Sequence, residues 1–179
     1  MLRDAHFPAP GIRRRLSCSW GPGPRAFVLG CNPSDANAER DDPTSKWWNR
    51  WFQHWGFGAY DAGNLYSFVT SSPAACRARA QAALAGQDWY DRDEMFANLA
   101  DVVAMAKQAD RVFVCFGAIA WDHDWVDHVI EAIQSGEGPW PDLWCWGTTK
   151  AGAPTHPLAR GKHRIDPLTA PVLWKAANA

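Results

Sequence analysis

Hydrophobic positions along this chain fall into two patterns, short apolar runs and stripes with helical spacing. Four runs read as strands, because apolar residues dominate each of them. They lie at about residues 25–31, 63–69, 111–116 and 143–146. The third run is nearly continuous, as in a central parallel strand that is covered on both faces. The Pro- and Gly-rich residues before the first run leave room for one short edge strand near residues 16–20.

Segments that favour helices lie between these runs. The first is expected to begin where Asp42 can cap a helix and Pro43 can take its first position. An Ala-rich helix is expected over Pro73–Ala85, and a longer one after Asp91 and Glu94, which resemble a capping box. Two further helices are expected after the turn at residues 117–120 and, as a short C-terminal element, near residues 168–176.

The first of these helices carries an aromatic stripe. Its members are Trp47, Trp48, Trp51, Phe52 and Trp55. Their helical spacing favours packing in the core over a platform for a ligand. Trp47 or Trp48, nearest the start of the helix, is the better candidate for lining a pocket.

The alternation of elements reads β-α-β-α-β-α-β. It predicts an α/β protein with three layers, in which helices cover both faces of a central, mainly parallel, four-stranded sheet with right-handed crossovers. We find no internal repeat and no linker, so residues 1–179 are expected to form a single domain.

Composition and charge narrow the class of protein. The chain is 47% hydrophobic with a net charge of -1, so it lacks the global basic field of a dedicated duplex-DNA binder, although a local basic patch is compatible with this charge. Its five cysteines form no C-x-x-C pair, which argues against a zinc ribbon or a disulfide framework. No segment has the length of a membrane span or the apolar core of a signal peptide, and a reducing cytoplasm is the expected location.

Candidate chemistry gathers where the expected strands end. The first strand runs into a turn that contains Asn32, Ser34 and Asp35, Asn64 lies in the second, and His156 follows the fourth. The carboxyl ends of parallel strands meet at one edge of a sheet, where ligands of open α/β sheets bind. A histidine there can donate a hydrogen bond to an oxygen that gains negative charge, and amides can position water or read a planar base.

These residues also carry a resemblance to a family. The motifs Asn32-Pro33-Ser34, Asp41-Asp42-Pro43-Thr44, Gly63-Asn64-Leu65, Phe116-Gly117 and His156-Pro157-Leu158, with Trp55-Gly56-Phe57-Gly58 and the segment from Gly147 to Gly152, resemble the bacterial and phage family called domain of unknown function 1643. The resemblance runs from about residue 14 to about residue 165. Three positions depart from expected residues: Lys46 and Thr155 stand where that family usually or often has Arg, and Leu158 stands where a more distant superfamily has Ser.

That more distant superfamily is the uracil-DNA glycosylases. Gly30-Cys31-Asn32-Pro33-Ser34 is similar to its first motif and His156-Pro157-Leu158 to its second. The resemblance implies a glycosylase-like fold and a hydrolase that releases a modified or damaged nucleobase. Asn32 would position water, His156 would donate to the base carbonyl, and Asn64 would read the base. The further substrate-binding residues expected are Cys31, Pro33, Ser34, Asp42, Thr44, Trp47, Gly117, Lys150 and Pro157.

Several alternatives stay open. A non-catalytic module that holds a nucleotide, a nucleic acid or a protein in the same pocket suits the near-neutral charge and the three departures. Cys31 with His156 would make a thiol nucleophile and its base. His123, Asp124, Asp127 and His128 form two i, i+4 pairs that a metal could use, but a solvated helix face is the simpler reading, and no metal or cofactor is expected.

The expected partner is a nucleic acid or a nucleotide, and the protein is not expected to bind a membrane. Six basic residues could form a rim that contacts a phosphate backbone, or merely a solvated surface: Arg77, Arg79, Arg160, Lys162, His163 and Arg164. The sequence does not indicate an oligomeric state.

Overall fold

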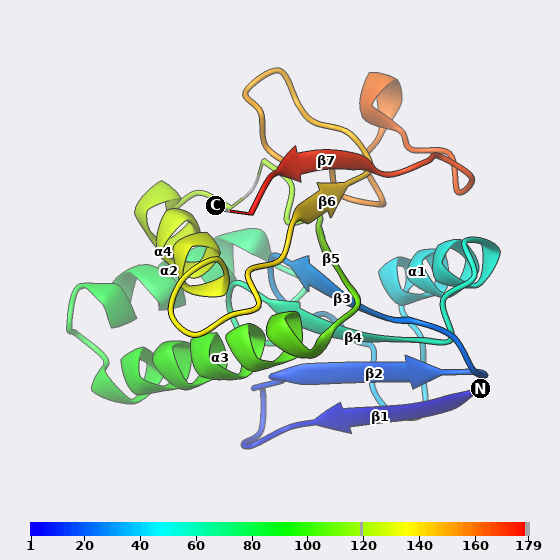
Figure 1. Cartoon of the computed structure of the whole chain (residues 1–179). Coiled ribbons are helices and arrows are strands. Elements are labelled where there is room, and N and C mark those ends of the chain that lie inside the picture. The colour runs from blue at the N-terminus through cyan, green and yellow to red at the C-terminus, as the bar shows by residue number, and fades with distance from the viewer. Residues whose placement is uncertain (119, 178–179) are drawn as a thin grey trace.

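The computed structural model describes residues 1–118 and 120–177, which form a mixed seven-stranded sheet and four α-helices (Figure 1). The strands are β1 (Leu2–His6), β2 (Arg15–Ser19), β3 (Arg25–Gly30), β4 (Ala59–Asn64), β5 (Arg111–Val114), β6 (Leu143–Cys145) and β7 (Val172–Lys175). The helices are α1 (Pro43–His54), α2 (Pro73–Leu84), α3 (Trp89–Gln108) and α4 (His123–Ile133), with a short 3-10 turn, η1, at Gly161–His163.

The strands follow the order β1-β2-β4-β3-β5-β6-β7 across the sheet. The four expected strands form its parallel centre, with β3 between β4 and β5, and β6 beside β5. The expected count of four was wrong, because three antiparallel strands extend both edges. β1 and β2 add to β4 on one side, and β7 adds to β6 on the other. The expected edge strand near residues 16–20 is β2, which lies inside the sheet rather than at its edge.

The second expected strand was placed too late in the chain. β4 covers Ala59–Asn64, because this segment pairs with β3 on one side and β2 on the other. Its polar residue, Asp61, accepts hydrogen bonds from Ser17 and Arg25 and so can lie within the sheet. Asn64 is therefore the last residue of β4, opposite Gly30 at the end of β3.

Two helices differ from expectation. α3 begins at Trp89 with Asp88 as its cap, so the expected capping box at Asp91 and Glu94 was wrong: these carboxylates lie within the helix. The C-terminal helix expected near residues 168–176 is also wrong, because Val172–Lys175 form β7 against β6. The turn before α4 contains residue 119, which lies outside the described residues; the helix itself is capped by Asp122.

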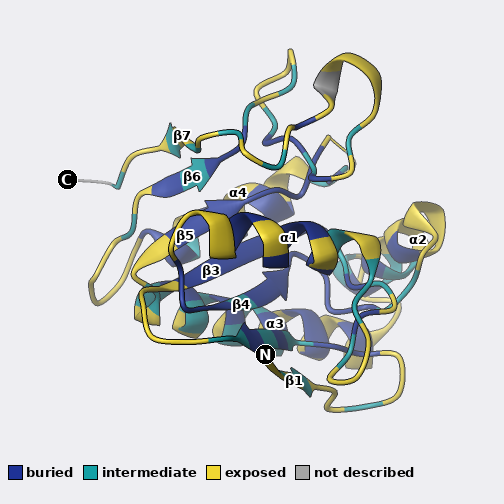
Figure 2. Ribbon diagram, turned by 90° about the vertical axis from the view of Figure 1, so that its right-hand side faces the viewer, coloured by how far each residue is buried: buried dark blue, intermediate teal, exposed yellow. Residues whose placement is uncertain are grey.

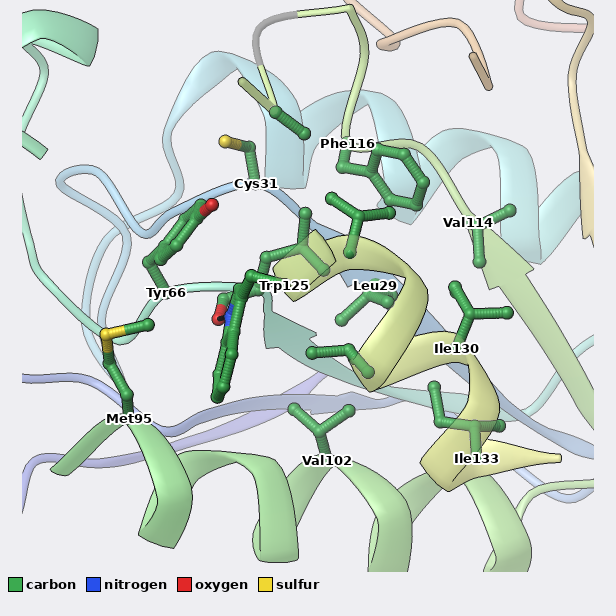
Figure 3. Close-up of a cluster of buried hydrophobic side chains, with 14 of the residues drawn as sticks. Leu29, Cys31, Tyr66, Met95, Val102, Val114, Phe116, Trp125, Ile130 and Ile133 are labelled. Atoms are coloured by element: carbon green, nitrogen blue, oxygen red, sulfur yellow. Dashed lines mark hydrogen bonds between the residues drawn. The ribbon is translucent and has the colours of Figure 1, made fainter. Parts of the chain in front are cut away.

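The helices cover both faces of the sheet (Figure 2). On one face, α1 buries an aromatic cluster that includes Trp47, Trp48, Trp51 and Phe52, although Trp55 of the expected stripe is exposed. On the other face, α2, α3 and α4 bury a mainly aliphatic cluster. Figure 3 shows side chains of α3 and α4 meeting in this cluster. None of the described helices is both long and apolar enough to cross a membrane.

Candidate functional site

A cavity of about 210 Å³ opens where β3 and β4 end. Gly30 and Asn64 are paired across these strands, so the loops that follow them leave the sheet side by side. The loop after β6 adds His156 to the same cavity. Seven residues that the sequence suggested line it: Cys31, Asn32, Ser34, Asp42, Thr44, Asn64 and His156.

Asn32 is oriented by two hydrogen bonds. Its Nδ2 group donates to the carbonyl oxygen of Pro33 (3.0 Å) and to that of Thr70 (2.8 Å). The segments are further joined by the backbone N–H of Thr70, which donates to the same Pro33 carbonyl at 3.0 Å. Both amide hydrogens of Asn32 are therefore engaged, and the group that it can offer a ligand or a water molecule is the acceptor Oδ1.

His156 is held as a neutral donor. Its Nδ1 accepts a hydrogen bond from the backbone N–H of Leu158 at 3.1 Å, so the neutral ring carries its hydrogen on Nε2. Burial lowers the pKa of His156 below its ordinary value of 6.5, and the opposing influence of Asp42 is smaller. At neutral pH the ring is thus uncharged and has one N–H to donate.

Gly117 packs against the loop that carries His156, which we call the histidine loop (residues 154–158), and it does not line the cavity. Its backbone N–H donates to the Pro154 carbonyl at 3.0 Å, and a Cβ at this position would lie 3.3 Å from the Cβ of His156. Its φ of +72° is a conformation that L side chains rarely adopt. Only glycine meets both requirements without strain.

Asn64 is buried to 3% exposure, and its Nδ2 has no hydrogen-bond partner within the part of the chain that is described. The amide lies against Gly30, where an added Cβ would come within 2.8 Å of the Asn64 Oδ1. A buried amide without a partner is costly in a folded protein. Its place in the wall of a cavity suits an amide that bonds a ligand.

Residues at the start of α1 line another side of the cavity. Asp42 caps the helix, since its Oδ1 accepts the Ser45 backbone N–H at 2.7 Å while its own N–H donates to the Ser45 hydroxyl at 2.9 Å. This reciprocal cap fixes the direction in which the Asp42 and Thr44 side chains leave the helix. Together with Ser34 they supply polar groups to the cavity.

Six suggested residues lie outside the cavity, and one of them, Asp35, is exposed. Trp47 is packed in the aromatic cluster, stacked on Trp51 at 6.4 Å and edge-on to Trp146 at 4.9 Å. Trp48 lines the cavity in its place. Lys150 is exposed, and Pro33 is buried within the loop that follows β3 but does not line the cavity. Gly117 has the supporting position already described, and Pro157 lines a neighbouring hollow.

That hollow has a volume of about 740 Å³ and lies beside the histidine loop. Pro157 and Trp47 form part of it, together with Arg50, Arg160 and Arg164. Of the six basic residues expected to form a rim, Arg160 and Arg164 line this hollow. Arg79 is instead paired with Asp91 at 2.5 Å and lies over the Phe68 ring, so it belongs to the packed side of the protein.

The sequence analysis did not single out Arg13, which also lines the cavity. Its side chain is buried, and burial lowers the pKa of its guanidinium. The signal available was the run Arg13-Arg14-Arg15, whose members point in different directions: Arg14 pairs with Glu94 and Arg15 with Asp4. Thr70, Ser71 and Pro73, at the start of α2, were missed as well.

The structure weakens two alternatives. Burial raises the pKa of the Cys31 thiol to about 12, so the thiolate that a nucleophile needs is absent at neutral pH. The side chain lies in the buried cluster shown in Figure 3. Within residues 1–118 and 120–177, no three His, Cys, Asp or Glu side chains are grouped as a metal site would require.

Comparison with known families gives a match over most of the chain. The model of the family described as "Protein of unknown function (DUF1643)" matches residues 13–158, and the chain belongs to this family. The matched range includes Arg13 and runs through the histidine loop, so it contains every residue of the cavity. No curated protein and no solved structure matches the chain significantly.

Proposed function

We propose that this member of the DUF1643 family takes a single planar nucleobase into the cavity and hydrolyses its N-glycosidic bond. The observation that carries the proposal is that three side chains from separate segments, Asn32 after β3, Asn64 at the end of β4 and His156 after β6, line one small cavity. They offer an acceptor, an amide and a neutral N–H donor. This set matches the roles that the resemblance to uracil-DNA glycosylases implies.

The reaction needs two kinds of help. As the bond between the sugar C1′ and the base nitrogen breaks, its electron pair moves into the base, and the sugar becomes oxocarbenium-like. The Nε2–H of His156 would donate to the base oxygen that gains this charge, while Oδ1 of Asn32 would hold the water that attacks C1′. The proton released by water ends on the departed base or in solvent. One such donor is worth roughly a hundredfold or more in rate.

The size of the cavity supports a single base as the part that enters. In a nucleic acid, the nucleotide would have to leave the stack to reach it. The neighbouring hollow with Arg50, Arg160 and Arg164 is placed to contact phosphates outside the cavity. A fully charged substrate backbone could thus lie along the surface while one base occupies the interior.

A non-catalytic binding module is the second candidate. Asn32 favours it, because an amide cannot take a proton from water as a carboxylate can. The same cavity would then hold a base or nucleotide without breaking a bond.

A base-release assay separates the two. The substrates are single- and double-stranded oligonucleotides that contain uracil, hypoxanthine or a modified pyrimidine. Release by the wild-type protein is expected to fall roughly a hundredfold in Asn32→Ala and His156→Ala. Lys150→Ala, an exposed position outside the cavity, is the matched control and should keep full activity.

The outcome against the reaction is equally clear. If the folded wild-type protein releases no base from any of these substrates but a base or nucleotide raises its melting temperature, the protein is a binder. If release persists in both Asn32→Ala and His156→Ala, the assigned roles are wrong.

A further inference from the structure

Arg13 is a buried cation that forms no ion pair with any carboxylate of residues 1–118 and 120–177. Five other arginines each have a carboxylate oxygen within 4 Å: Arg3, Arg14, Arg15, Arg25 and Arg79. Arg13 is 3% exposed, yet no described carboxylate lies within ion-pair distance of it. Its Nη1 donates to the Ala36 carbonyl at 2.6 Å, and its Nε is buried with no partner among the residues described. Asp42 in the same cavity wall offsets part of the cost, since its charge raises the pKa of Arg13, but burial lowers that pKa by more. A buried charge that is only partly compensated remains costly unless something else neutralises it.

The backbone around Arg13 is fixed. Its N–H donates to the Ser67 carbonyl at 2.9 Å, and the N–H of Val69 donates to Gly11 at 2.9 Å. The preceding residue, Ile12, is fully buried and bridged to Phe68. The connection between β1 and β2 is thereby tied to the segment after β4, and the guanidinium is held at the cavity wall rather than carried by a mobile loop.

The start of α2 faces the same cavity through Thr70, Ser71 and Pro73. This helix has 12 residues, a neutral cap in Ser72, whose hydroxyl accepts the Ala75 N–H at 3.2 Å, and no acidic residue in its first turn. The positive end of its dipole is therefore not compensated by a carboxylate, and such helix ends favour anions. Arg13 and this helix end converge on one small volume.

We infer that the ligand of this cavity carries an oxyanion, a phosphate or a carboxylate, which binds between Arg13 and the start of α2. The inference rests on the same cavity as the proposed function and adds that the group entering it is negatively charged. Asp42, which is the carboxylate in the cavity wall, lies at the start of α1, where its Oδ1 is already occupied by the Ser45 N–H. It can accept an N–H of the ligand while Arg13 binds the anion.

Two sources could supply the anion. It is either a nucleotide phosphate that enters the cavity with the base, distinct from the backbone phosphates outside it, or a carboxyl substituent on the base itself. Both present oxygen atoms that match the planar fork of a guanidinium. Neutral nucleosides and unsubstituted bases lack this group and would leave Arg13 without a partner.

Calorimetric titration of the wild-type protein with matched probes tests the inference directly. One pair is uridine and uridine 5′-monophosphate, and the other is uracil and orotate, which is uracil with a carboxyl group; inorganic phosphate is the simplest probe. The charged member of at least one pair should bind roughly tenfold tighter or more. The pair that responds identifies the source. Equal binding within both pairs, or no binding of any charged probe, would overturn the inference.

Variants test whether Arg13 is the cause. Arg13→Gln should abolish the preference for the charged probe and leave binding of the neutral one unchanged. Arg92→Gln, an exposed arginine on α3 that lies outside the cavity, changes the net charge equally and should retain the preference. Circular dichroism melting checks that each variant is folded; if Arg13→Gln is not, Arg13→Met and the wild-type probe pairs still decide. A folded Arg13 variant that keeps the preference contradicts the assignment.

The results also separate this inference from the proposed reaction. Charge preference without base release removes the glycosylase but leaves the anion site. Base release without charge preference does the reverse.

Discussion

Two buried polar regions of this protein differ in how their groups are satisfied. On the face of the sheet that α3 covers, Glu94 accepts hydrogen bonds from the Arg14 Nε at 2.8 Å, from its Nη2 at 2.5 Å and from the Ser67 hydroxyl at 3.0 Å. In the cavity, by contrast, the Arg13 Nε and the Asn64 Nδ2 have no partner among the described residues. The two regions are close in the chain, since Arg13 and Arg14 are neighbours.

The difference separates buried groups that the fold itself satisfies from buried groups that the proposed ligand would satisfy. A buried network whose members bond one another is complete and contributes to stability. Buried groups left open in one cavity cost stability, and a folded protein retains them where they serve another purpose. Substitutions in the two regions should therefore have opposite consequences: those on the face that α3 covers should change stability, and those in the cavity should change binding.

The largest effect is expected from Glu94→Ala. It leaves the Ser67 hydroxyl without its acceptor and the Arg14 guanidinium with only the longer contact to Asp101 at 3.5 Å, and it should lower the free energy of unfolding by about 3 kcal/mol. The estimate takes the low end for a buried pair because Arg14 is 20% exposed and keeps some contact with water. Urea denaturation measures the loss.

Asn64→Ala is the matched substitution in the cavity. Because the amide it removes has no partner for its Nδ2, the free energy of unfolding should change by less than about 1 kcal/mol. A loss as large as that of Glu94→Ala would mean that the cavity amide belongs to the structural framework, and the contrast between the regions would collapse.

An effect smaller than that of Glu94→Ala is expected from Gly117→Ala, which should lower the free energy of unfolding by about 1 kcal/mol because of its positive φ. Gly86→Ala is a control with a φ of +75° and nothing within 4 Å of an added Cβ. Both variants should lose similar stability, but only Gly117→Ala should shift the NMR signals of His156 and reduce base release. Unchanged His156 signals would remove the supporting role assigned to Gly117.

The smallest effect concerns pH. Because the pKa of His156 is lowered in the folded protein, the unfolded chain binds the proton first as pH falls below about 6.5. The contribution of neutral His156 to the free energy of unfolding is therefore fully present above pH 6.5. It is lost as the pH falls toward the lowered pKa of His156 in the folded protein. NMR titration of the ring should give a midpoint below 6.5, and His156→Gln should flatten the pH dependence of unfolding in this window. A midpoint above 6.5 would contradict the neutral donor.

The centre of the sheet could be predicted from the sequence because its strands are buried and therefore apolar. β3 and β5 show such runs clearly. The edge strands could not, since β1 alternates between exposed and half-buried residues and β7 is mostly exposed. β7 forms because Val172–Lys175 finds a partner in β6, which is a pairing between distant segments that local sequence does not reveal.

The candidate site shows the same division. Asn32, Asn64 and His156 could be selected because they lie at or after the ends of parallel strands. Arg13 could not be selected in this way. It reaches the cavity from the connection between β1 and β2, and the hydrophobic pattern did not predict β1. Trp48 rather than Trp47 lines the cavity because adjacent residues of a helix point about 100° apart, which spacing alone does not resolve.

The two carbonyl groups that hold Asn32 restrict what could replace it. An aspartate at this position would have the size and shape of the amide, but it would direct a carboxylate oxygen at the lone pairs of Pro33 and Thr70 instead of donating to them. The turn that aims the side chain thus excludes the stronger base from the same place. In the proposed reaction, a stronger base would therefore have to come from another residue of the cavity or from rebuilding both loops together.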